Sequence, residues 1–319
     1  MAKVSGNYLI ARTLKEEGVD TLFYLMGGPN FDTIMECQDV GIKTIDFRHE
    51  QAAAMAAHAY SRVTGKPSVV MAASGPGTLN LLTGVYTASI DCAPMIVLGG
   101  ASAVHEIGRD TFQEVDQVGI MQPLCKYWHR PTMASRFPEI ISTAYRQSQS
   151  GRPGPVYIDC GGDVLYEEVE EESVPAPSRA VERTRPVATS GDIEKAISLI
   201  ADADKPMLFA GGGAFFSGAA PELESFVDIT NIPFYTAPMS RGLIPEDHAV
   251  SFQGARSTAM RESDVILVVG TRMNWMMNYG QRFSPNAKII QIDINLSLIH
   301  ISEPTRRYAI SYAVFCLKK

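Results

Sequence analysis

The sequence is poor in cysteine and has no long apolar run, and each shortage excludes a class of protein. Its 319 residues contain five cysteines, which are widely scattered and form no C-x-x-C pair, so neither a disulfide framework nor a zinc site is indicated. No apolar stretch approaches the roughly 20 residues that cross a bilayer, and the N-terminus lacks the basic region and apolar core of a signal peptide. We therefore predict a cytoplasmic protein with no membrane-inserted segment.

Basic residues are also fewer than acidic ones. The chain has 28 Lys and Arg against 35 Asp and Glu, which gives a net charge of −7. This balance argues against a nucleic-acid partner and against binding to an anionic membrane surface. The composition, 45% hydrophobic and 20% charged, is typical of a soluble globular protein. The length suggests about two domains.

One stretch in the first third of the chain carries the most informative pattern. A short apolar strand is expected over 44–47, and an Ala-rich helix begins near Glu50. A second strand is expected over 68–73, and it ends in the Ser-Gly-Pro-Gly run of residues 74–77 before another helix. In an open α/β sheet, ligands bind outside the carboxyl ends of the strands. Both turns therefore belong to the edge where a ligand site is expected.

Glu50 is the candidate catalytic residue of this stretch, and the residues alone leave two interpretations open. A lone carboxylate followed by alanines is poorly hydrated, and burial would make it a usable proton donor and acceptor near neutral pH. Alternatively, Glu50 lies in the first helical turn to complement the macrodipole, with Arg48 and His49 as solvated neighbours. The run at 74–77 is similarly open, because it could hold an anion or simply form a tight connection.

Four ordered motifs resemble the pyrimidine-binding domain of thiamine-diphosphate enzymes. These enzymes include acetolactate synthase, benzoylformate decarboxylase, oxalyl-CoA decarboxylase and 2-hydroxyacyl-CoA lyase. The motifs are Gly27-Gly28-Pro29, Arg48-His49-Glu50, Gly65-Lys66-Pro67 and the run from Ser74 to Asn80. The resemblance implies that Glu50 matches the family glutamate. That glutamate hydrogen-bonds the aminopyrimidine ring and drives the tautomer change by which the cofactor's own amine deprotonates its thiazolium carbon.

The same resemblance implies further site residues. The residues that would shape the pyrimidine pocket are Gly28, Pro29, Ser74, Gly75, Gly77 and Asn80. Taken alone, residues 112–117 (Phe-Gln-Glu-Val-Asp-Gln) form a polar loop, but in the family this region reaches toward the reacting carbon, so Gln113 is a second catalytic candidate. The Phe-Gln pair has the form seen in acetolactate synthases. The residues after it look more like oxalyl-CoA decarboxylase and hydroxyacyl-CoA lyase.

Alternating strands and helices predict an α/β protein with two domains. Residues 1–166 are expected to form a doubly wound parallel sheet, and 190–295 an incomplete Rossmann-like domain in which Ser190 caps the first helix. Between them, 167–189 is acidic and Pro-rich and is interpreted as a solvated linker. Strands are expected at 21–25, 43–47, 68–73, 95–99 and 156–159 in the first domain, and at 206–210, 267–270 and 289–293 in the second.

The second domain could bind a nucleotide. Its glycine run at 211–213 is not G-x-G-x-x-G, and Asp293 at a strand end could bond a ribose or cap a helix. The resemblance implies FAD, as in acetolactate synthases, or ADP, as in oxalyl-CoA decarboxylase, with Arg272 and Asp293 at the nucleotide and Arg152 near its phosphate. One departure speaks against this site, because oxalyl-CoA decarboxylase carries a lysine where this chain has Gly212.

The end of the chain departs from the family. From Leu296 onward the sequence resembles the in-frame translation of a sequencing adaptor, so residues 296–319 are interpreted as an artefactual tail. The family binds its diphosphate through Mg²⁺ and a Gly-Asp-Gly motif in a third domain. Here Gly162-Asp163 is followed by Val164, so the motif does not fit. No metal ligand is assigned in this chain, and the Mg²⁺ ligands are expected in a missing domain.

These observations predict a fragment of a thiamine-diphosphate enzyme that cleaves or forms a C–C bond next to a carbonyl. The resemblance is greatest to oxalyl-CoA decarboxylase and 2-hydroxyacyl-CoA lyase, with a small 2-oxo acid or acyl-CoA as substrate and a homodimer or homotetramer as the assembly. The truncated chain is expected to be inactive alone. An enzymatic alternative is an acetolactate-synthase-like carboligase with FAD in the central domain. An alternative of another class is an inactive nucleotide-binding fragment.

Overall fold

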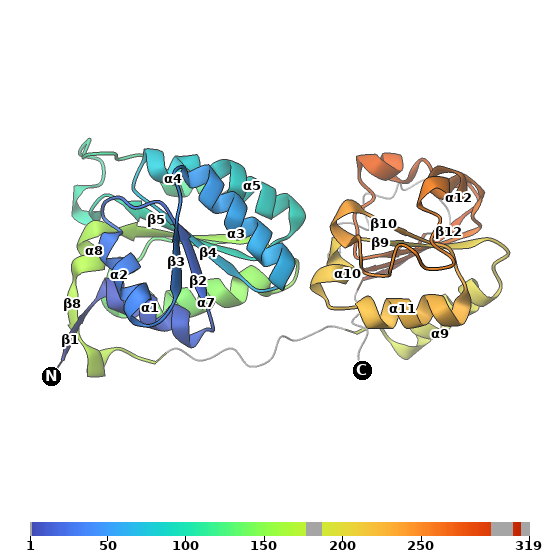
Figure 1. The fold of residues 1–319 in the computed structure, drawn as a ribbon, viewed down its shortest axis with the longest axis horizontal. Helices are drawn as coiled ribbons and strands as arrows, with labels where there is room; N and C mark the ends of the chain where they lie inside the picture. Colours follow the sequence, from blue (N-terminus) through green and yellow to red (C-terminus); the bar gives the residue numbers. More distant parts are fainter. Residues whose placement is uncertain (1, 177–186, 295–308, 314–319) are drawn as a thin grey trace. The chain divides into compact units, whose positions relative to one another are not determined.

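A computed structural model of the chain describes residues 2–176, 187–294 and 309–313. The chain divides into two compact units, residues 1–183 and 184–319, and each is described by itself (Figure 1).

The first unit is built on a sheet of six strands in the order β3-β2-β4-β5-β7-β6, all of them parallel. Its strands are β2 (Thr21–Tyr24), β3 (Lys43–Asp46), β4 (Ser68–Ala72), β5 (Met95–Ala101), β6 (Tyr127–His129) and β7 (Pro155–Gly161). The five strands predicted from the sequence are confirmed to within two residues at each end, and β6 is an addition at the sheet edge.

Helices cover both faces of this sheet, so the predicted doubly wound fold is confirmed. One face carries α1 (Gly6–Glu16), α2 (Phe31–Asp39), α7 (Phe137–Gln149) and α8 (Gly162–Tyr166), and the other carries α3 (Glu50–Thr64), α4 (Pro76–Asn80) and α5 (Leu82–Asp91) (Figure 1). The short helix α6 (Gln117–Met121) contacts β6 and β7. Gly65, with φ +70°, ends α3 in the left-handed conformation that its sequence predicts.

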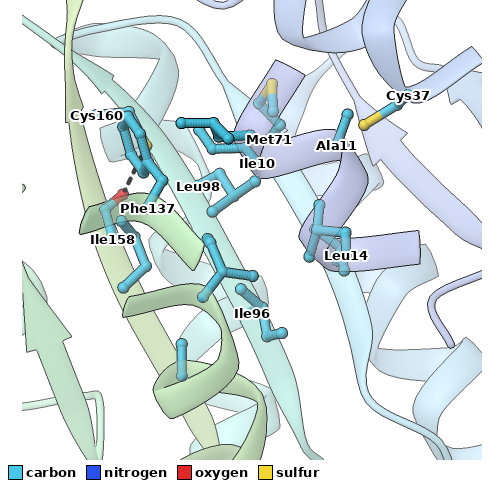
Figure 2. Packing of buried hydrophobic residues seen from close by; sticks show 14 of the residues in the cluster. Ile10, Ala11, Leu14, Cys37, Met71, Ile96, Leu98, Phe137, Ile158 and Cys160 are labelled. Atoms are coloured by element: carbon cyan, nitrogen blue, oxygen red, sulfur yellow. Dashed lines mark hydrogen bonds between the residues drawn. The ribbon is translucent and has the colours of Figure 1, made fainter. Parts of the chain in front are cut away.

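The main core of the first unit lies between α1, α2, α7 and the sheet. Ile10 and Leu14 recur at helical spacing on α1 and are fully buried against strand residues such as Met71 and Leu98 (Figure 2). Phe137 of α7 fills the same cluster. Burying one such aliphatic side chain stabilises the fold by about 1.5–3 kcal/mol, so this packing fixes the sheet on which the site is built.

The strand order reverses between β2 and β4. From β2 the chain crosses through α2 to β3 on one side, and then returns through α3 to β4 on the other side of β2. The turns that follow β2 and β4 therefore leave toward opposite faces of the sheet. A crevice at such a reversal, outside the carboxyl ends of the strands, is the usual ligand position in open α/β sheets.

The first unit extends beyond the boundary predicted at residue 166. The strand β8 (Glu168–Glu170) pairs antiparallel with β1 (Lys3–Ser5), and the 3-10 helix η3 (Glu171–Ser173) follows. Arg12 Nη1 bonds the Glu171 carboxylate at 2.9 Å, and Val174 joins the main core. The interpretation of 167–189 as a solvated linker is therefore wrong for residues 167–174, because β8 pairs with β1 and the Glu167 and Glu171 carboxylates accept hydrogen bonds from Ala134 and Arg12. Residues 177–186 lie outside the described residues.

The second unit has a five-stranded parallel sheet in the order β10-β9-β11-β12-β13, as expected of a Rossmann-like domain. Its strands are β9 (Pro206–Ala210), β10 (Phe234–Thr236), β11 (Val265–Val269), β12 (Lys288–Asp293) and β13 (Ala309–Ala313), and its helices are α9 (Ser190–Ala201), α10 (Gly212–Phe216), α11 (Ala220–Thr230) and α12 (Arg256–Glu262). The cap of α9 is Thr189, whose side chain accepts from the N–H of Asp192, so the prediction of Ser190 is wrong by one residue.

Strand β13 lies inside the segment interpreted as an artefactual tail. It pairs in parallel with β12, with Ile289 opposite Ala309. The sheet therefore uses five residues of that segment, while 295–308 and 314–319 lie outside the described residues. The origin of the segment stays a prediction.

Candidate active site

Glu50 is the first residue of α3 and is buried, with 8% of its surface exposed. Its neighbours Arg48 and His49 are exposed, and the His49 ring caps the helix by accepting the backbone N–H of Gln51 at 3.1 Å. The predicted shelter of the Glu50 carboxyl from water is confirmed. Both sequence interpretations describe part of the result. Glu50 begins a helix, whose N-terminus stabilises negative charge, and the Glu50 side chain is nevertheless buried.

Asn80 and Gly77 define the surroundings of the Glu50 carboxyl group. Asn80, the last residue of α4, donates its Nδ2–H to Glu50 Oε2 at 2.9 Å. A Cβ atom on Gly77 would lie 3.4 Å from Glu50 Oε1, so this oxygen faces the backbone of the turn after β4. Among the described residues, none donates a hydrogen bond to Oε1. One oxygen is thus oriented by an amide, and the other can exchange a proton with a ligand.

The turn after β4 is bonded to the turn after β2. The backbone N–H of Ser74 donates to the carbonyl of Gly28 at 3.2 Å, and Asn30 Nδ2 donates to the carbonyl of Ala72 at 2.5 Å. The Gly28–Pro29 peptide bond is cis. The two turns that flank the reversal of strand order therefore form one continuous edge.

Gln113 reaches the same edge from the loop that precedes α6. The Ser74 hydroxyl donates to Gln113 Oε1 at 2.8 Å. Gln113 has φ +59°, which is uncommon for a residue with a side chain. Gly75 has φ +56°, and a Cβ atom there would lie 2.5 Å from the Gln113 carbonyl oxygen, so only glycine fits. The loop thus packs directly on the turn, although Phe112 beside it is 82% exposed.

Gln117 is a site residue that the sequence did not single out. It is 2% exposed, and its Oε1 accepts the backbone N–H of Gly75 at 2.5 Å. Its Nε2 lies 2.9 Å from the Gly100 carbonyl, 3.0 Å from the Tyr157 hydroxyl and 2.8 Å from Asp159 Oδ1. One carboxamide therefore ties the turn after β4 to the ends of β5 and β7.

Asp159 anchors this network from β7, which lies between β5 and β6 in the sheet. Its carboxyl group is fully buried and is bound by Gln117, by the Tyr157 hydroxyl and, at 2.5 Å, by Arg130 Nε. Burial together with the nearby carboxylate of Asp159 raises the pKa of Tyr157 well above its ordinary value. A buried carboxylate is tolerated only where charge and hydrogen-bond partners surround it, which is the case here.

A pocket of about 150 Å³ adjoins the network, with Gln113, Gln117 and Arg130 in its lining. Ser102 also lines it, and the buried Ser102 Oγ has no hydrogen-bond partner among the described residues. Backbone N–H groups, first that of Gly108, lower the pKa of Glu114 in the same lining. The Glu114 carboxylate is therefore bonded to its own loop, and the pocket lining also contains the Asp116 carboxyl beside amide, hydroxyl and guanidinium groups.

The structure brings eight of the predicted site residues together at one edge of the first sheet. They are Gly28, Pro29, Glu50, Ser74, Gly75, Gly77, Asn80 and Gln113. The carbonyl of Pro29 also accepts the Tyr166 hydroxyl at 3.3 Å. Their roles toward a cofactor stay predictions.

Arg152 lies at the amino ends of the strands, just before β7 and opposite the end where the candidate site lies. Its Nη2 donates to the Ser89 carbonyl and its Nε to Cys92 Sγ, each at 2.9 Å. These bonds attach the guanidinium to the end of α5. They give Arg152 a structural role inside the first unit, and its predicted phosphate contact stays a prediction.

Arg272 and Asp293 lie in the second unit. Arg272 follows the carboxyl end of β11, and Asp293 is the last residue of β12. These strands are neighbours, with Val269 opposite Ile292, so the two residues lie at the same end of the strands of the second sheet.

The described part of the chain holds no group of three or more His, Cys, Asp or Glu side chains that could bind a metal ion. None of the described helices is long and apolar enough to cross a membrane.

The glycine run of the second unit serves a close crossing of two turns. The backbone N–H of Gly213 donates to the Gly270 carbonyl at 2.8 Å, and a Cβ atom on Gly211 would lie 2.2 Å from Thr271 Cβ. Chain packing alone therefore explains why glycine is needed at Gly211.

Comparison with protein families gives two matches. The family described as "Thiamine pyrophosphate enzyme, N-terminal TPP binding domain" matches residues 4–120. The one described as "Thiamine pyrophosphate enzyme, central domain" matches residues 193–312. Each match falls on one of the two units, and the second extends into β13.

Curated relatives carry three kinds of name. The chain is 35% identical over 308 residues to 2-hydroxyacyl-CoA lyase of Arabidopsis thaliana, covering 94% of this chain and 54% of that protein. It is 33% identical over 304 residues to oxalyl-CoA decarboxylase of Escherichia coli, covering 94% and 54%. It is 39% identical over 306 residues to "Probable acetolactate synthase large subunit" of Methanococcus aeolicus, covering 92% and 51%. The chain thus spans about half the length of these relatives.

Proposed function

The chain belongs to the thiamine pyrophosphate (thiamine diphosphate) enzyme family, and we propose that its first unit binds the aminopyrimidine ring of this cofactor against Glu50. The observation that carries the proposal is the buried Glu50 carboxyl group, oriented by Asn80 at the reversal of strand order. A flat aminopyrimidine ring has the ring nitrogen and amine that such a carboxyl and the neighbouring backbone groups can bond.

The residues present fit such a ring. Glu50 Oε1 has no donor among the described residues, so a ligand can use it without displacing a protein contact. Gly77 keeps the turn free of a side chain at 3.4 Å from this oxygen. The bonded turns after β2 and β4 provide a rigid edge beside it. A carboxyl held in this way is preorganised, which increases its effect in the transition state.

Each residue of the site has a distinct proposed role. Glu50 exchanges a proton with the pyrimidine ring, and Asn80 holds the Glu50 carboxyl in the plane that the exchange needs. The turn at Gly28 and Pro29 and the turn at Ser74 enclose the ring and exclude water. Gln113 extends its carboxamide toward the reacting centre. When bound, the cofactor supplies the electron sink that lets a bond next to a carbonyl break or form.

For the intact protein we propose a lyase or decarboxylase that acts next to the carbonyl of an acyl-CoA or 2-oxo acid. The names 2-hydroxyacyl-CoA lyase and oxalyl-CoA decarboxylase, at 35% and 33% identity, support this class. Mg²⁺ would hold the diphosphate through ligands outside the described residues. A homodimer or homotetramer is proposed with it, because Met26 and Phe31, large apolar side chains next to the site, are 54% and 49% exposed.

The experiment that tests this function is calorimetric titration of the 319-residue chain with thiamine and two analogues. Pyrithiamine keeps the aminopyrimidine, and oxythiamine replaces its amine by an oxo group. Thiamine and pyrithiamine are expected to bind with similar affinity and oxythiamine about tenfold more weakly, because the hydrogen bond that the amine donates to a backbone carbonyl is lost. Equal binding of all three compounds, or no binding, would overturn the proposed site.

A carboligase with FAD in the second unit is the competing enzymatic function. The acetolactate synthase relative, at 39% identity, favours it. Thermal stabilisation by FAD but not by ADP or CoA would support the carboligase, and stabilisation by ADP alone would support the lyase class. Turnover of an acyl-CoA or 2-oxo acid by these 319 residues would exclude an inactive nucleotide-binding fragment.

A further inference from the structure

Gln117 makes side-chain hydrogen bonds to four different residues of the first unit, and no step proposed above uses it. It bonds Gly75, Gly100, Tyr157 and Asp159 from a position that is 2% exposed. A buried carboxamide must satisfy both its oxygen and its N–H groups, and Gln117 does so only in this orientation. The side chain is therefore fixed by its surroundings and can in turn fix them.

Two hydrogen bonds and one peptide bond connect Gln117 to the candidate site residue Gln113. Gln117 Oε1 holds the Gly75 N–H at 2.5 Å. Gly75 has φ +56°, and because glycine can adopt many other conformations, this hydrogen bond helps to select the one that the turn uses. The adjacent residue Ser74 donates its hydroxyl to Gln113 Oε1 at 2.8 Å. Release of the Gly75 N–H would therefore loosen the turn on the side that faces Gln113 and weaken the contact between Ser74 and the Gln113 carboxamide.

The Nε2 group of Gln117 bonds Asp159, whose position is itself fixed by other residues. Asp159, on β7, is fully buried and is held by Arg130 and Tyr157 as well as by Gln117. Because Asp159 needs these donors to remain in the interior, the network has one favourable arrangement. We propose that Gln117 is a positioning residue, which transmits this arrangement through Gly75 to Ser74 and Gln113 and so aims the Gln113 carboxamide at the reacting centre.

The role of Gln113 at a reacting centre rests on the proposed function. The link from Gln117 through Gly75 and Ser74 to Gln113 can be tested without a ligand. The substitution Gln117→Glu keeps an oxygen for the Gly75 N–H and removes the Nε2 donor. The introduced carboxyl would face Asp159, the Tyr157 hydroxyl and the Gly100 carbonyl, with Arg130 beyond Asp159. When protonated, it regains one O–H donor and resembles the native carboxamide. Burial and the neighbouring carboxylate both favour the protonated form.

The readouts are the hydrogen-exchange protection of the Gly75 amide and the resonances of the Gln113 side-chain amide. Each is compared with the wild-type chain at the same pH. At pH 8, Gln117→Glu is expected to lower the protection of Gly75 about tenfold, because Asp159 repels the ionised carboxyl and moves its oxygen away from the Gly75 N–H, and to shift the Gln113 signals. Both changes should reverse toward pH 6. Gln117→Ala should show the changes without the reversal, because it cannot regain a donor.

Controls separate positioning from general destabilisation. Gln122→Glu makes the same charge change at an exposed position just after α6 and should leave Gly75 and Gln113 unaltered. Tyr157→Phe removes only a hydroxyl from the network, and it should lower Gly75 protection partly, which keeps the test open if Gln117→Glu fails to fold.

Unchanged protection of Gly75 in both Gln117 variants, or changes in Gly75 that leave Gln113 unaffected, would overturn the proposal. Absence of thiamine binding by the wild-type chain would count against the proposed function alone.

Discussion

Asn80 Nδ2 lies 2.9 Å from Glu50 Oε2 and joins two residues that are 30 positions apart in the sequence. Glu50 begins α3 and Asn80 ends α4, so the bond forms only when strands β3 and β4 are placed in one sheet. The candidate active site is therefore a product of the tertiary fold and not of a local motif.

We expect Asn80→Ala to weaken thiamine binding about five- to tenfold, because Glu50 loses the donor that orients it. Asn80→Asp should weaken binding further, because a second carboxylate replaces the donor and repels that of Glu50. Calorimetric titration measures both. Gln38→Ala, which removes an exposed side-chain amide that donates to Thr44, is the control. Native affinity in Asn80→Asp at pH 8 would contradict the assigned contact.

Gly75→Ala should lower the free energy of unfolding of the first unit by about 2 kcal/mol or more. Both its φ of +56° and the 2.5 Å approach to the Gln113 carbonyl oppose a side chain. Gly65→Ala is the matched control, since Gly65 has φ +70° with nothing within 4 Å of an added Cβ atom. Urea denaturation should show the larger loss for Gly75→Ala. Equal losses would mean that the loop of Gln113 does not pack on the turn.

Arg152→Ala should lower the melting temperature of the chain and leave thiamine affinity unaltered, because the guanidinium bonds the end of α5 at the far edge of the sheet. Thermal unfolding and titration of the same sample measure the two effects. Unaltered stability together with lost ADP binding would instead support the phosphate contact that the sequence predicts for Arg152.

Tyr60 and Asp20 give a prediction for alkaline pH. Burial, and then the 2.5 Å hydrogen bond to Asp20, raise the pKa of Tyr60 from 10 to about 12. The folded state therefore keeps the phenolic proton longer than the unfolded state, and this contribution to stability is lost as the pH rises from 10 to about 12. In Asp20→Asn the pKa of Tyr60 should fall but stay above 10, because its burial is unchanged. NMR titration of the Tyr60 ring carbons measures it, and a pKa of 10 would contradict the account.

The fold, and the end of the sheet at which the candidate site lies, could be predicted from the sequence because they depend on strong local signals. The apolar run of β4 and the Ser-Gly-Pro-Gly turn after it predict a strand end, and Gly65 predicts the end of α3. The order of the motifs then places Glu50 near that turn. The burial of Glu50 could only be inferred, since it depends on which helices cover the sheet.

Gln117 and its partners were not predicted, because their roles depend on contacts between distant segments. One signal was present: Tyr157 and Asp159 are polar residues two positions apart in an otherwise apolar strand, so they share one face. A fully buried acid on such a face requires partners, but the sequence does not show that they are Gln117 and Arg130. The short strands β1 and β8 were likewise missed, because charged residues in them mask the strand pattern.

The contact between Glu50 and the cofactor ring is tested most simply by the affinity of thiamine for the Glu50→Gln variant, measured by calorimetric titration beside the wild-type chain. Glu139→Gln is the control, since Glu139 lies in the first turn of α7 with 66% of its side chain exposed. We predict that Glu50→Gln weakens binding about 10- to 100-fold, as expected for a hydrogen bond to a charged group, while Glu139→Gln binds as the wild type does. Native affinity in Glu50→Gln would contradict the assignment of this carboxyl to the cofactor ring.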